Sequence, residues 1–439
     1  MCPGRIAGGL ALTLIAACTS SSTTTLPSPS STVAPTTTRA TITTTTTTIA
    51  VETGVWRSIA AGPLSPRVLA LAVWAEEELI VVGGYDDDPC LPTRQADGAS
   101  GGSGFASAAF CFAIKSQAID GAAFDPDTGT WRLIATPPVP VTRGAASAVF
   151  HDGVVYILVA GQPGAFLAYH PGQDRWEELP PPTTRLGILI EAGDRLALFR
   201  NDNSEGNPDD WGNDPNREVA PDLLFDPETM AWSEIPPDPL IPSFDRSMVW
   251  TGSELVLLGA EAVPQPGSDA PAFMRAAIFN PETGTWRRLP DSDLVIAGGY
   301  RWYLAEGRLI NPTLDAADGG QTNPYDRSYP RGGILDLESG EWLPLPDPPV
   351  DPYVPGAFIG YSAGSPDELL SGYGWLFDPA TGRWQSLPAP PDNSSIPVPR
   401  NGSTVLFAGP DLVVWGGFLY GEDGRGEMVA TGWMWRFGT

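Results

Sequence analysis

The stretch Phe124-Asp125-Pro126-Asp127-Thr128-Gly129-Thr130-Trp131 returns five more times, with small changes, along this 439-residue chain. In each copy a Trp lies six residues after an Asp, Asn or His. Proline favours the first inner position of a type I turn, and an Asp or Asn before it can accept hydrogen bonds from later backbone N–H groups. A glycine such as Gly129 supplies the left-handed residue that closes such a loop. The stretch therefore predicts a tight hairpin between two strands. The other copies cover residues 169–176, 225–232, 279–286, 335–342 and 377–384.

A second regularity follows each Trp. Leu or Ile lies three residues later and a proline comes at once or soon after, as in Leu179-Pro180 and Leu289-Pro290. Trp56 has Ile59 in the same place but no turn motif before it. The tryptophans recur about every fifty residues, a period that is typical of β-propellers rather than of solenoids. We therefore interpret Trp56 as a seventh copy of the strand that follows the turn.

Two apolar runs of strand length precede each turn motif. Some of the second runs end in a double glycine, Gly83-Gly84 or Gly416-Gly417. Runs that are apolar throughout are typical of strands buried on both faces. The order of double glycine, aromatic residue, acidic turn and Trp resembles the kelch repeat over residues 55–439, although the double glycine is reduced or absent in the other units. This resemblance, to a family that includes the propeller of galactose oxidase, implies a β-propeller fold.

We expect an all-β chain that folds as a seven-bladed β-propeller with four-stranded antiparallel blades. The last apolar strand, around Trp433 and Trp435, is not followed by another turn and Trp strand. The strand at Trp56 is the piece that is missing there. We therefore predict that the N-terminal strand completes the last blade and closes the ring, which leaves no open edge between the two chain ends.

The N-terminal part predicts export. Residues 1–17 contain Arg5 and a short apolar run that is too short to span a bilayer, as in a signal peptide. Ile15-Ala16-Ala17-Cys18 resembles the lipobox of bacterial lipoproteins, which implies lipidation of Cys18 and a chain that is lipid-anchored to the outer face of the bacterial cell membrane, in an extracytoplasmic location. The alternative is an ordinary signal peptide. Residues 18–52 are rich in Ser, Thr and Pro and are predicted to be a disordered tether, which leaves 53–439 for the propeller.

Charge and cysteine content narrow the partners. The net charge of −27 disfavours nucleic acid, which is held by a surplus of Lys and Arg. Cys90 and Cys111 remain after export and lie in one long predicted loop. They are predicted to form a disulfide, because bridges persist in oxidising compartments.

No catalytic residue is assigned. The two histidines, His151 and His170, lie in predicted turns, and no nucleophile–histidine set or phosphate loop is visible. The galactose oxidase resemblance implies a copper site, but its set of His, Tyr and Cys ligands is not supplied here, so that activity is disfavoured and no metal ligand is assigned. Residues 201–206 resemble the first half of a calcium loop, with Gly212 where the last Glu ligand belongs. No cofactor is therefore assigned, and calcium is the one candidate.

Two features are candidates for binding. Loops 85–119, 201–221, 261–274, 312–331 and 418–429 would gather on one face of a propeller. Aromatic side chains in these loops suit sugars or peptides, unless each ring covers its own loop. Arginines at the entry to the first strand of a blade could line the channel mouth and favour an anionic ligand such as a carboxylate sugar, unless they pair with loop carbonyls and aspartates. The candidates are Trp211, Tyr325, Tyr329, Arg67, Arg143 and Arg400, with Arg185 and Arg246 displaced by two or three residues.

These features favour a non-catalytic scaffold that binds a carbohydrate or a cell-surface protein. The alternative is a carbohydrate-active enzyme of a mutarotase- or lyase-like kind, as some kelch-type propellers are, which would work at the channel mouth. The oligomeric state stays open.

Overall fold

The computed structural model describes residues 54–86, 117–160, 164–183, 187–200, 221–240, 243–261, 273–296, 302–314, 332–349, 363–365, 369–370, 374–388, 390–391, 400, 402–420 and 426–437. All of them belong to the compact unit Val51–Thr439. The following predicted features lie outside the described residues: the signal peptide, the tether, Cys18, Cys90, Cys111, Arg185, Trp211, Tyr325 and Tyr329.

Apart from one two-stranded hairpin, the described strands form antiparallel sheets of four, numbered here in chain order. Sheet 1 holds β2 (Leu71–Ala75), β3 (Glu78–Val82), β4 (Gly121–Asp125) and β5 (Thr130–Leu133). Sheet 2 holds β6 (Ala146–His151), β7 (Val154–Val159), β8 (Ala165–His170) and β9 (Arg175–Leu179). Sheet 3 holds β10 (Ile188–Ala192), β11 (Arg195–Phe199), β12 (Leu223–Asp226) and β13 (Ala231–Glu234). Sheet 4 holds β14 (Ser243–Trp250), β15 (Leu255–Glu261), β16 (Met274–Asn280) and β17 (Thr285–Arg288).

The remaining strands complete the set. Sheet 5 holds β18 (Tyr303–Ala305), β19 (Arg308–Asn311), β20 (Gly333–Asp336) and β21 (Trp342–Pro344). Sheet 6 holds β22 (Ala363–Gly364), β23 (Leu369–Leu370), β24 (Trp375–Asp378) and β25 (Arg383–Ser386). Sheet 7 holds β26 (Thr404–Ala408), β27 (Asp411–Trp415), β30 (Gly432–Arg436) and β1 (Trp56–Ile59). The hairpin β28 (Phe418–Tyr420) and β29 (Gly426–Met428) stands apart from them.

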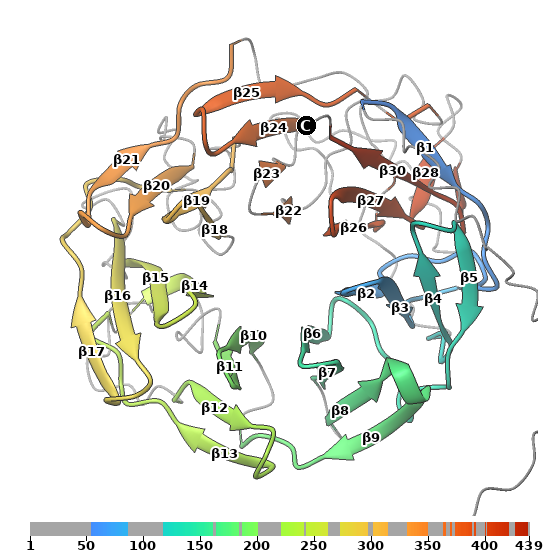
Figure 1. Ribbon diagram of the computed structural model, residues 1–439, viewed down its shortest axis with the longest axis horizontal. Coiled ribbons are helices and arrows are strands. Elements are labelled where there is room, and N and C mark those ends of the chain that lie inside the picture. The colour runs from blue at the N-terminus through green and yellow to red at the C-terminus, as the bar shows by residue number, and fades with distance from the viewer. Residues whose placement is uncertain are drawn as a thin grey trace, which may run out of the picture. The chain divides into compact units, whose positions relative to one another are not determined.

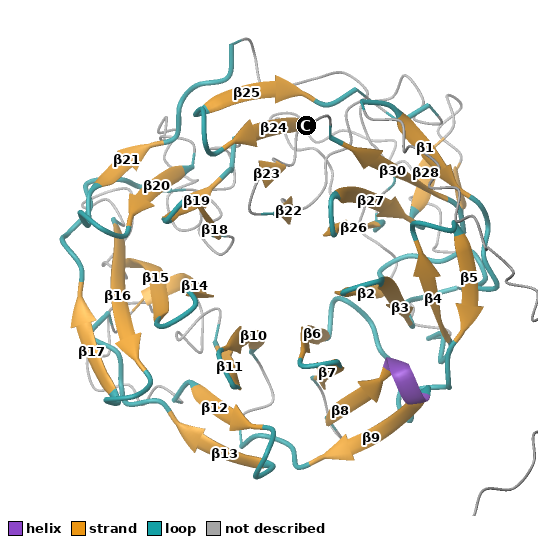
Figure 2. Ribbon diagram, viewed as in Figure 1, coloured by secondary structure: helices purple, strands orange, loops and turns teal. Residues whose placement is uncertain are grey.

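The fold is an all-β propeller with four-stranded antiparallel blades. Figures 1 and 2 show the sheets following one another around a ring, with a single short helix, η1 (Pro171–Gln173), in the described part of the chain. The sequence predicts seven blades. Six sheets are regular, with strands of three residues or more, whereas the two inner strands of sheet 6 have two residues each.

The core lies between neighbouring sheets, not in one central layer. Each cluster of buried apolar side chains joins two successive sheets, as with Leu79 of sheet 1 and Trp415 of sheet 7, or Ile80 of sheet 1 and Ile157 of sheet 2. The second and third strands are mostly apolar because both of their faces meet such a cluster. The contacts therefore run around the ring without a break.

The N-terminal strand closes the ring, as predicted. β1 is the outer strand of sheet 7 and pairs with β30, with Trp56 opposite Trp435 and Ile59 opposite Gly432. Ile59 is buried, and Figure 1 shows the blue β1 beside the dark red β30. The two ends of the described chain thus meet in one sheet.

The repeated turn forms as the sequence predicts. Asp125 Oδ1 accepts hydrogen bonds from the N–H groups of Asp127 (2.9 Å) and Thr128 (3.1 Å), and Gly129 closes the turn with φ +68°. Asp226, Asn280, Asp336 and Asp378 accept the bond from the residue three positions later in the same way. The second copy differs, because His170 leads into η1 and the left-handed residue there is Asp174.

The repeated Trp has a role that the sequence did not reveal. Its indole N–H donates to a backbone carbonyl in the linker before its own sheet, and that carbonyl lies four residues after the Trp of the preceding sheet. The seven bonds, 2.7–3.2 Å long, run from Trp131 to Ala60, Trp176 to Ala135, Trp232 to Pro180, Trp286 to Pro236, Trp342 to Pro290, Trp384 to Pro346 and Trp56 to Pro388.

Candidate functional site

One face of the propeller carries the long loops. At this face, which we call the loop face, a loop joins the second strand of each sheet to the third. A linker leads from the outer strand to the next sheet at the same face. The short hairpin turns lie at the opposite end of the strands, on the turn face. Three arginines lie near the loop face at equivalent places: Arg67, Arg143 and Arg400. Each lies four residues before a residue of the inner strand, and that residue pairs with one at or near the end of the second strand. The predicted common position of these three arginines is therefore confirmed.

Arg67 is a buried clamp at the base of the first long loop. Its side chain is 1% exposed. Nη1 donates to Gly83 O (3.1 Å) and Asp120 Oδ1 (2.6 Å), and Nε donates to Ser65 O (2.9 Å). Gly83 directly follows β3 and Asp120 directly precedes β4, so the guanidinium joins the two ends of the loop between these strands.

Arg400 repeats this arrangement in sheet 7. Nη1 lies 3.5 Å from Gly416 O and also donates to Thr431 O, while Nη2 lies 3.3 Å from the Thr431 hydroxyl. Gly416 corresponds to Gly83 and Thr431 to Asp120, because each pair occupies the same place in the strand register. The two sheets with an intact double glycine thus have the same kind of arginine clamp. The partner directly before the third strand is a carboxylate, Asp120, in sheet 1 and a neutral threonine, Thr431, in sheet 7.

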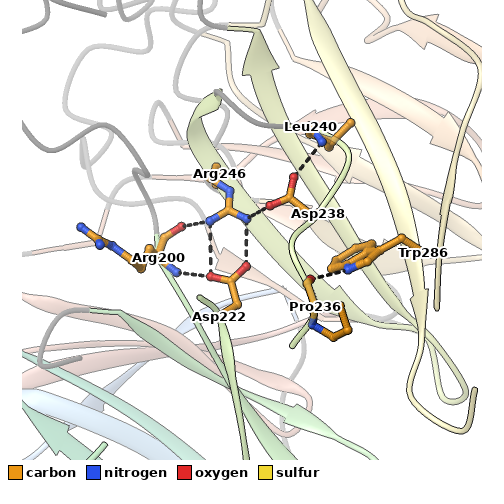
Figure 3. A network of polar contacts seen from close by, with 7 residues as sticks. All are labelled: Arg200, Asp222, Pro236, Asp238, Leu240, Arg246 and Trp286. Atoms are coloured by element: carbon orange, nitrogen blue, oxygen red, sulfur yellow. Dashed lines mark hydrogen bonds and ion pairs between the residues drawn. The ribbon is translucent and has the colours of Figure 1, made fainter. Parts of the chain in front are cut away.

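Arg246 clamps the next loop from a different direction (Figure 3). It lies on β14 of sheet 4 but reaches back to sheet 3, where Nη1 donates to Arg200 O (3.1 Å) and Nη2 to Asp222 Oδ2 (2.8 Å). Nη2 also pairs with Asp238 Oδ2 (2.8 Å) in the linker between the two sheets. Arg200 and Asp222 stand at the two ends of the loop over 201–221, so this clamp ties the loop base, the linker and the next blade together.

The Arg246 cluster holds two carboxylates on one guanidinium. The side chains of Arg246, Asp222 and Asp238 are 1%, 6% and 5% exposed. Burial raises the pKa of Asp238 above its usual value, against the opposing effect of the Arg246 charge. Asp238 Oδ1 also accepts the N–H of Leu240 (2.8 Å). Both Nη atoms of Arg246 and both carboxylates bond within the protein, whereas Nε of Arg246 has no hydrogen-bond partner among the described residues, so the cluster is mainly structural.

A fourth clamp, Arg275, was not singled out from the sequence. It lies on β16, pairs with Glu261 at the end of β15 (2.8 Å), and donates to Ser292 O (2.7 Å) in the following linker. It therefore joins the two ends of the loop over 262–273. The signal that could have found these clamps is an Arg or carboxylate placed directly at the edge of an apolar strand, at either end of a long loop.

The predicted arginine ring thus divides into two groups. Arg67, Arg246 and Arg400 are buried and bonded to backbone carbonyls, carboxylates or a hydroxyl, which matches the alternative interpretation of pairing within the protein. Arg143 is only half-buried, and its Nη1 donates to Ser403 O (2.6 Å), at the entry to the inner strand of sheet 7. Arg143 therefore stands at the inner rim and does not bracket a loop.

Both histidines lie on the turn face with acidic neighbours. His151 Nδ1 is 3.4 Å from Glu191 and His170 Nε2 is 3.4 Å from Glu177. No group of three or more His, Cys, Asp or Glu side chains in the described part of the chain is arranged to hold a metal ion.

Among the described residues, no helix is long and apolar enough to cross a membrane.

Comparisons with known proteins add little. A scan against models of protein families matched none of them, and a search of curated proteins found no similar sequence. A solved structure titled "Structure of YjhT" is similar over 85% of this chain and 95% of its own, with 12% sequence identity and a TM-score of 0.39. Similarity at this level carries no argument about ligand or activity.

Proposed function

We propose that this chain is a secreted, lipid-anchored propeller of the kelch type, in which all seven sheets act as blades, and that it is a non-catalytic binding scaffold at the outer face of the bacterial cell membrane. The kelch assignment is supported by the repeated turn, by the indole–carbonyl bond made by every repeat tryptophan, and by the double glycines at Gly83 and Gly416. The proposed ligand is a carbohydrate or a cell-surface protein.

The observation that carries the proposal is the set of clamped loop bases. Arg67, Arg246, Arg275 and Arg400 each join the two ends of a loop on the same face. A loop with fixed ends loses less conformational entropy when it binds a ligand than a loop with free ends. Loops of different lengths on a rigid ring are suited to recognition, and binding residues commonly lie on such loops.

The anchor and the disulfide have separate tests. Metabolic labelling with a lipid probe is expected to mark the wild-type chain and not Cys18→Ser, and equal labelling would reject the anchor. For the disulfide, the stem of the first loop supports the pairing of Cys90 with Cys111. Tyr85 is bridged to Gln117, and Ala118 donates to Gly84 O (2.9 Å), so the loop leaves and returns side by side. A mass gain of two hydrogens on reduction is expected.

The binding test is an array of glycans and peptidoglycan fragments probed with residues 53–439, with calcium or with a chelator. The proposal expects saturable binding without turnover. Arg143→Ala is expected to weaken binding of acidic sugars, because this arginine lies at the inner rim, whereas His151→Gln on the turn face serves as the matched control. Steady turnover that Arg143→Ala abolishes would favour a carbohydrate-active enzyme instead. Loss of binding with the chelator would identify calcium as a cofactor.

A further inference from the structure

Sheet 7 is built differently from the other sheets. Its outer strand β1 comes from the start of the domain, whereas the outer strand of every other four-stranded sheet follows its neighbour through a short turn. β1 is also the first described strand after the N-terminal segment. Any pull on that segment therefore reaches the domain through β1, and only non-covalent contacts hold β1 to β30.

A buried ion cluster fastens β1 at the end where the chain enters. Asp411, the first residue of β27, has a side chain with 0% exposure. Its Oδ1 accepts from Arg57 Nη2 of β1 (2.8 Å) and from Arg436 Nε of β30 (3.0 Å). One carboxylate thus holds the closing strand and its neighbour together. The hydrogen bonds that the Arg436 guanidinium donates to Asp411 raise the pKa of Arg436.

The position of Arg436 explains how this cluster arises. In the strand register, Trp435 corresponds to Phe124, so Arg436 corresponds to Asp125, the residue that caps the turn in sheet 1. Sheet 7 has no turn to cap at this position. The position that holds a capping carboxylate or amide elsewhere is here filled by an arginine that bonds Asp411. Trp56 adds to the same end through its bond to Pro388 O (2.7 Å) and its edge contact with Trp435.

We propose that β1 is a load-bearing latch: tension on the N-terminal segment is held by the Asp411–Arg57–Arg436 cluster, and when this yields the ring opens between β1 and β30 while the other sheets stay folded. β1 runs from the turn face to the loop face, because Trp56 lies level with the turns and Ile59 with the long loops. A pull between the N-terminal segment and a partner on the loop face acts along β1 and loads all of its pairs together. A pull between the two chain ends loads them one after another, because Trp56 and Trp435 lie side by side.

The test is single-molecule pulling of the full chain with one handle at the N-terminus. The second handle is placed either at the C-terminus or at the exposed Pro181 position of the loop face, through an azide-bearing residue. The first opening is expected at a lower force with the C-terminal handle than with the handle at position 181. Release of residues 54–63 gives a step of about 35 Å at most, since an extended chain spans ~3.3–3.6 Å per residue. Equal forces in the two directions, or a first step several times longer, would overturn the latch.

Equivalent residues of sheet 1 provide the controls. Arg132 and Glu78 occupy the positions of Arg57 and Asp411, but β5 is joined to β4 by a turn. Asp411→Asn is expected to speed the first opening at least tenfold at a given force, whereas Glu78→Gln leaves it unchanged. If Asp411→Asn does not fold, Arg57→Gln with Arg132→Gln as its control makes the same comparison and leaves the Asp411–Arg436 pair in place. An unchanged first opening in Arg57→Gln would refute the proposal.

The relevance to the cell rests on the proposed lipid anchor, but the pulling experiment does not. Absence of lipid on Cys18 would remove the natural source of tension and leave the mechanical result intact. A lipidated chain whose β1 opens no earlier than the other sheets would retain the anchor and reject the latch. The two results therefore separate the two proposals.

Discussion

Sheets 1 and 7 have an ion pair between an arginine and a carboxylate at the same point of the repeat, but the two pairs differ in burial. In both, an arginine directly after the repeat Trp meets a carboxylate at the start of the second strand. In sheet 1 the side chains of Arg132 and Glu78 are 38% and 27% exposed. In sheet 7 those of Arg57 and Asp411 are 25% and 0% exposed, and Arg436 provides a second cation. In sheet 7 the carboxylate is therefore fully buried and pairs with two arginines, whereas in sheet 1 both side chains of the ion pair are partly exposed.

The difference reflects how each outer strand is attached. β5 follows β4 through a hairpin turn, so its pairing is local. Arg57 and Asp411 lie 354 residues apart, and closing so long a loop in a flexible chain costs about 3 kcal/mol more than closing a hairpin. The comparison teaches that, of these two equivalent ion pairs, the more buried one lies where the covalent connection between the outer strand and its neighbour is missing.

The largest effect is expected from removing the closing strand. Deletion of residues 55–60 exposes the edge of β30 and removes the buried Ile59, the ion cluster and the Ala60 carbonyl that bonds Trp131. We expect a loss of at least ~5 kcal/mol of unfolding free energy, because loss of a core side chain and of one partner of a buried ion pair each cost several kcal/mol. Thermal and urea unfolding followed by circular dichroism measure it. An unchanged melting temperature would show that β1 does not close the ring.

The ion pairs themselves come next. Asp411→Asn removes the anionic partner of two arginines in a buried place and is expected to cost about 3–5 kcal/mol. Glu78→Gln removes the less buried counterpart in sheet 1 and is expected to cost less than ~1 kcal/mol. Urea unfolding of both variants side by side gives the difference. Equal costs would mean that burial and the second arginine add nothing.

A third test asks whether the ion cluster alone holds β1 more firmly than β5 is held in sheet 1, or whether the Trp56 contacts contribute as well. Trp56→Phe and Trp131→Phe each remove one indole hydrogen bond to the linker before the sheet. Both variants are expected to lose about 1 kcal/mol, since each leaves a carbonyl without its donor. The two losses, measured by chemical denaturation, should agree closely. A clearly larger loss for Trp56→Phe would extend the reinforcement of sheet 7 to the aromatic contact.

The smallest effect concerns the turns that sheet 7 lacks. A backbone hydrogen bond from Thr229 lowers the pKa of Asp226, and one from Ser339 lowers that of Asp336. A lowered pKa in the folded state stabilises the fold above the unfolded value of about 3.9, and this contribution is lost as pH falls through the folded pKa. Asp226→Asn should therefore flatten the dependence of the melting temperature on pH below about 4. Asn280→Asp should steepen it, because Asn280 already fills the same turn without a charge.

Much of the architecture could be predicted because its causes are local. The turn at Asp125 depends on bonds to residues two and three positions away, so it can be recognised in every copy. The missing last strand and the spare strand at Trp56 predicted the closure that the pairing with β30 confirms. The repeat period located the blades, although the short inner strands of sheet 6 depart from it.

The candidate site was predicted less well. The sequence identified Arg67, Arg246 and Arg400 by position, but two interpretations were open, an anion-binding ring or pairing within the protein. The partners that two of these arginines have in the structure lie far along the chain: Asp120 is 53 residues from Arg67, and Thr431 is 31 residues from Arg400. No local rule connects such residues.

The sequence by itself determined the repeat and its turns, because each depends on backbone geometry or hydrophobic pattern within a few residues, and it identified the closing strand as the spare copy of that pattern at Trp56. Only the tertiary structure decided what the polar residues do. A guanidinium has the same intrinsic chemistry at Arg57, Arg67 and Arg246, and its role follows from the carboxylate or carbonyl that the fold brings beside it and from the exclusion of water there. That is why one arginine clamps a loop, another ties two blades together, and a third holds the ring closed.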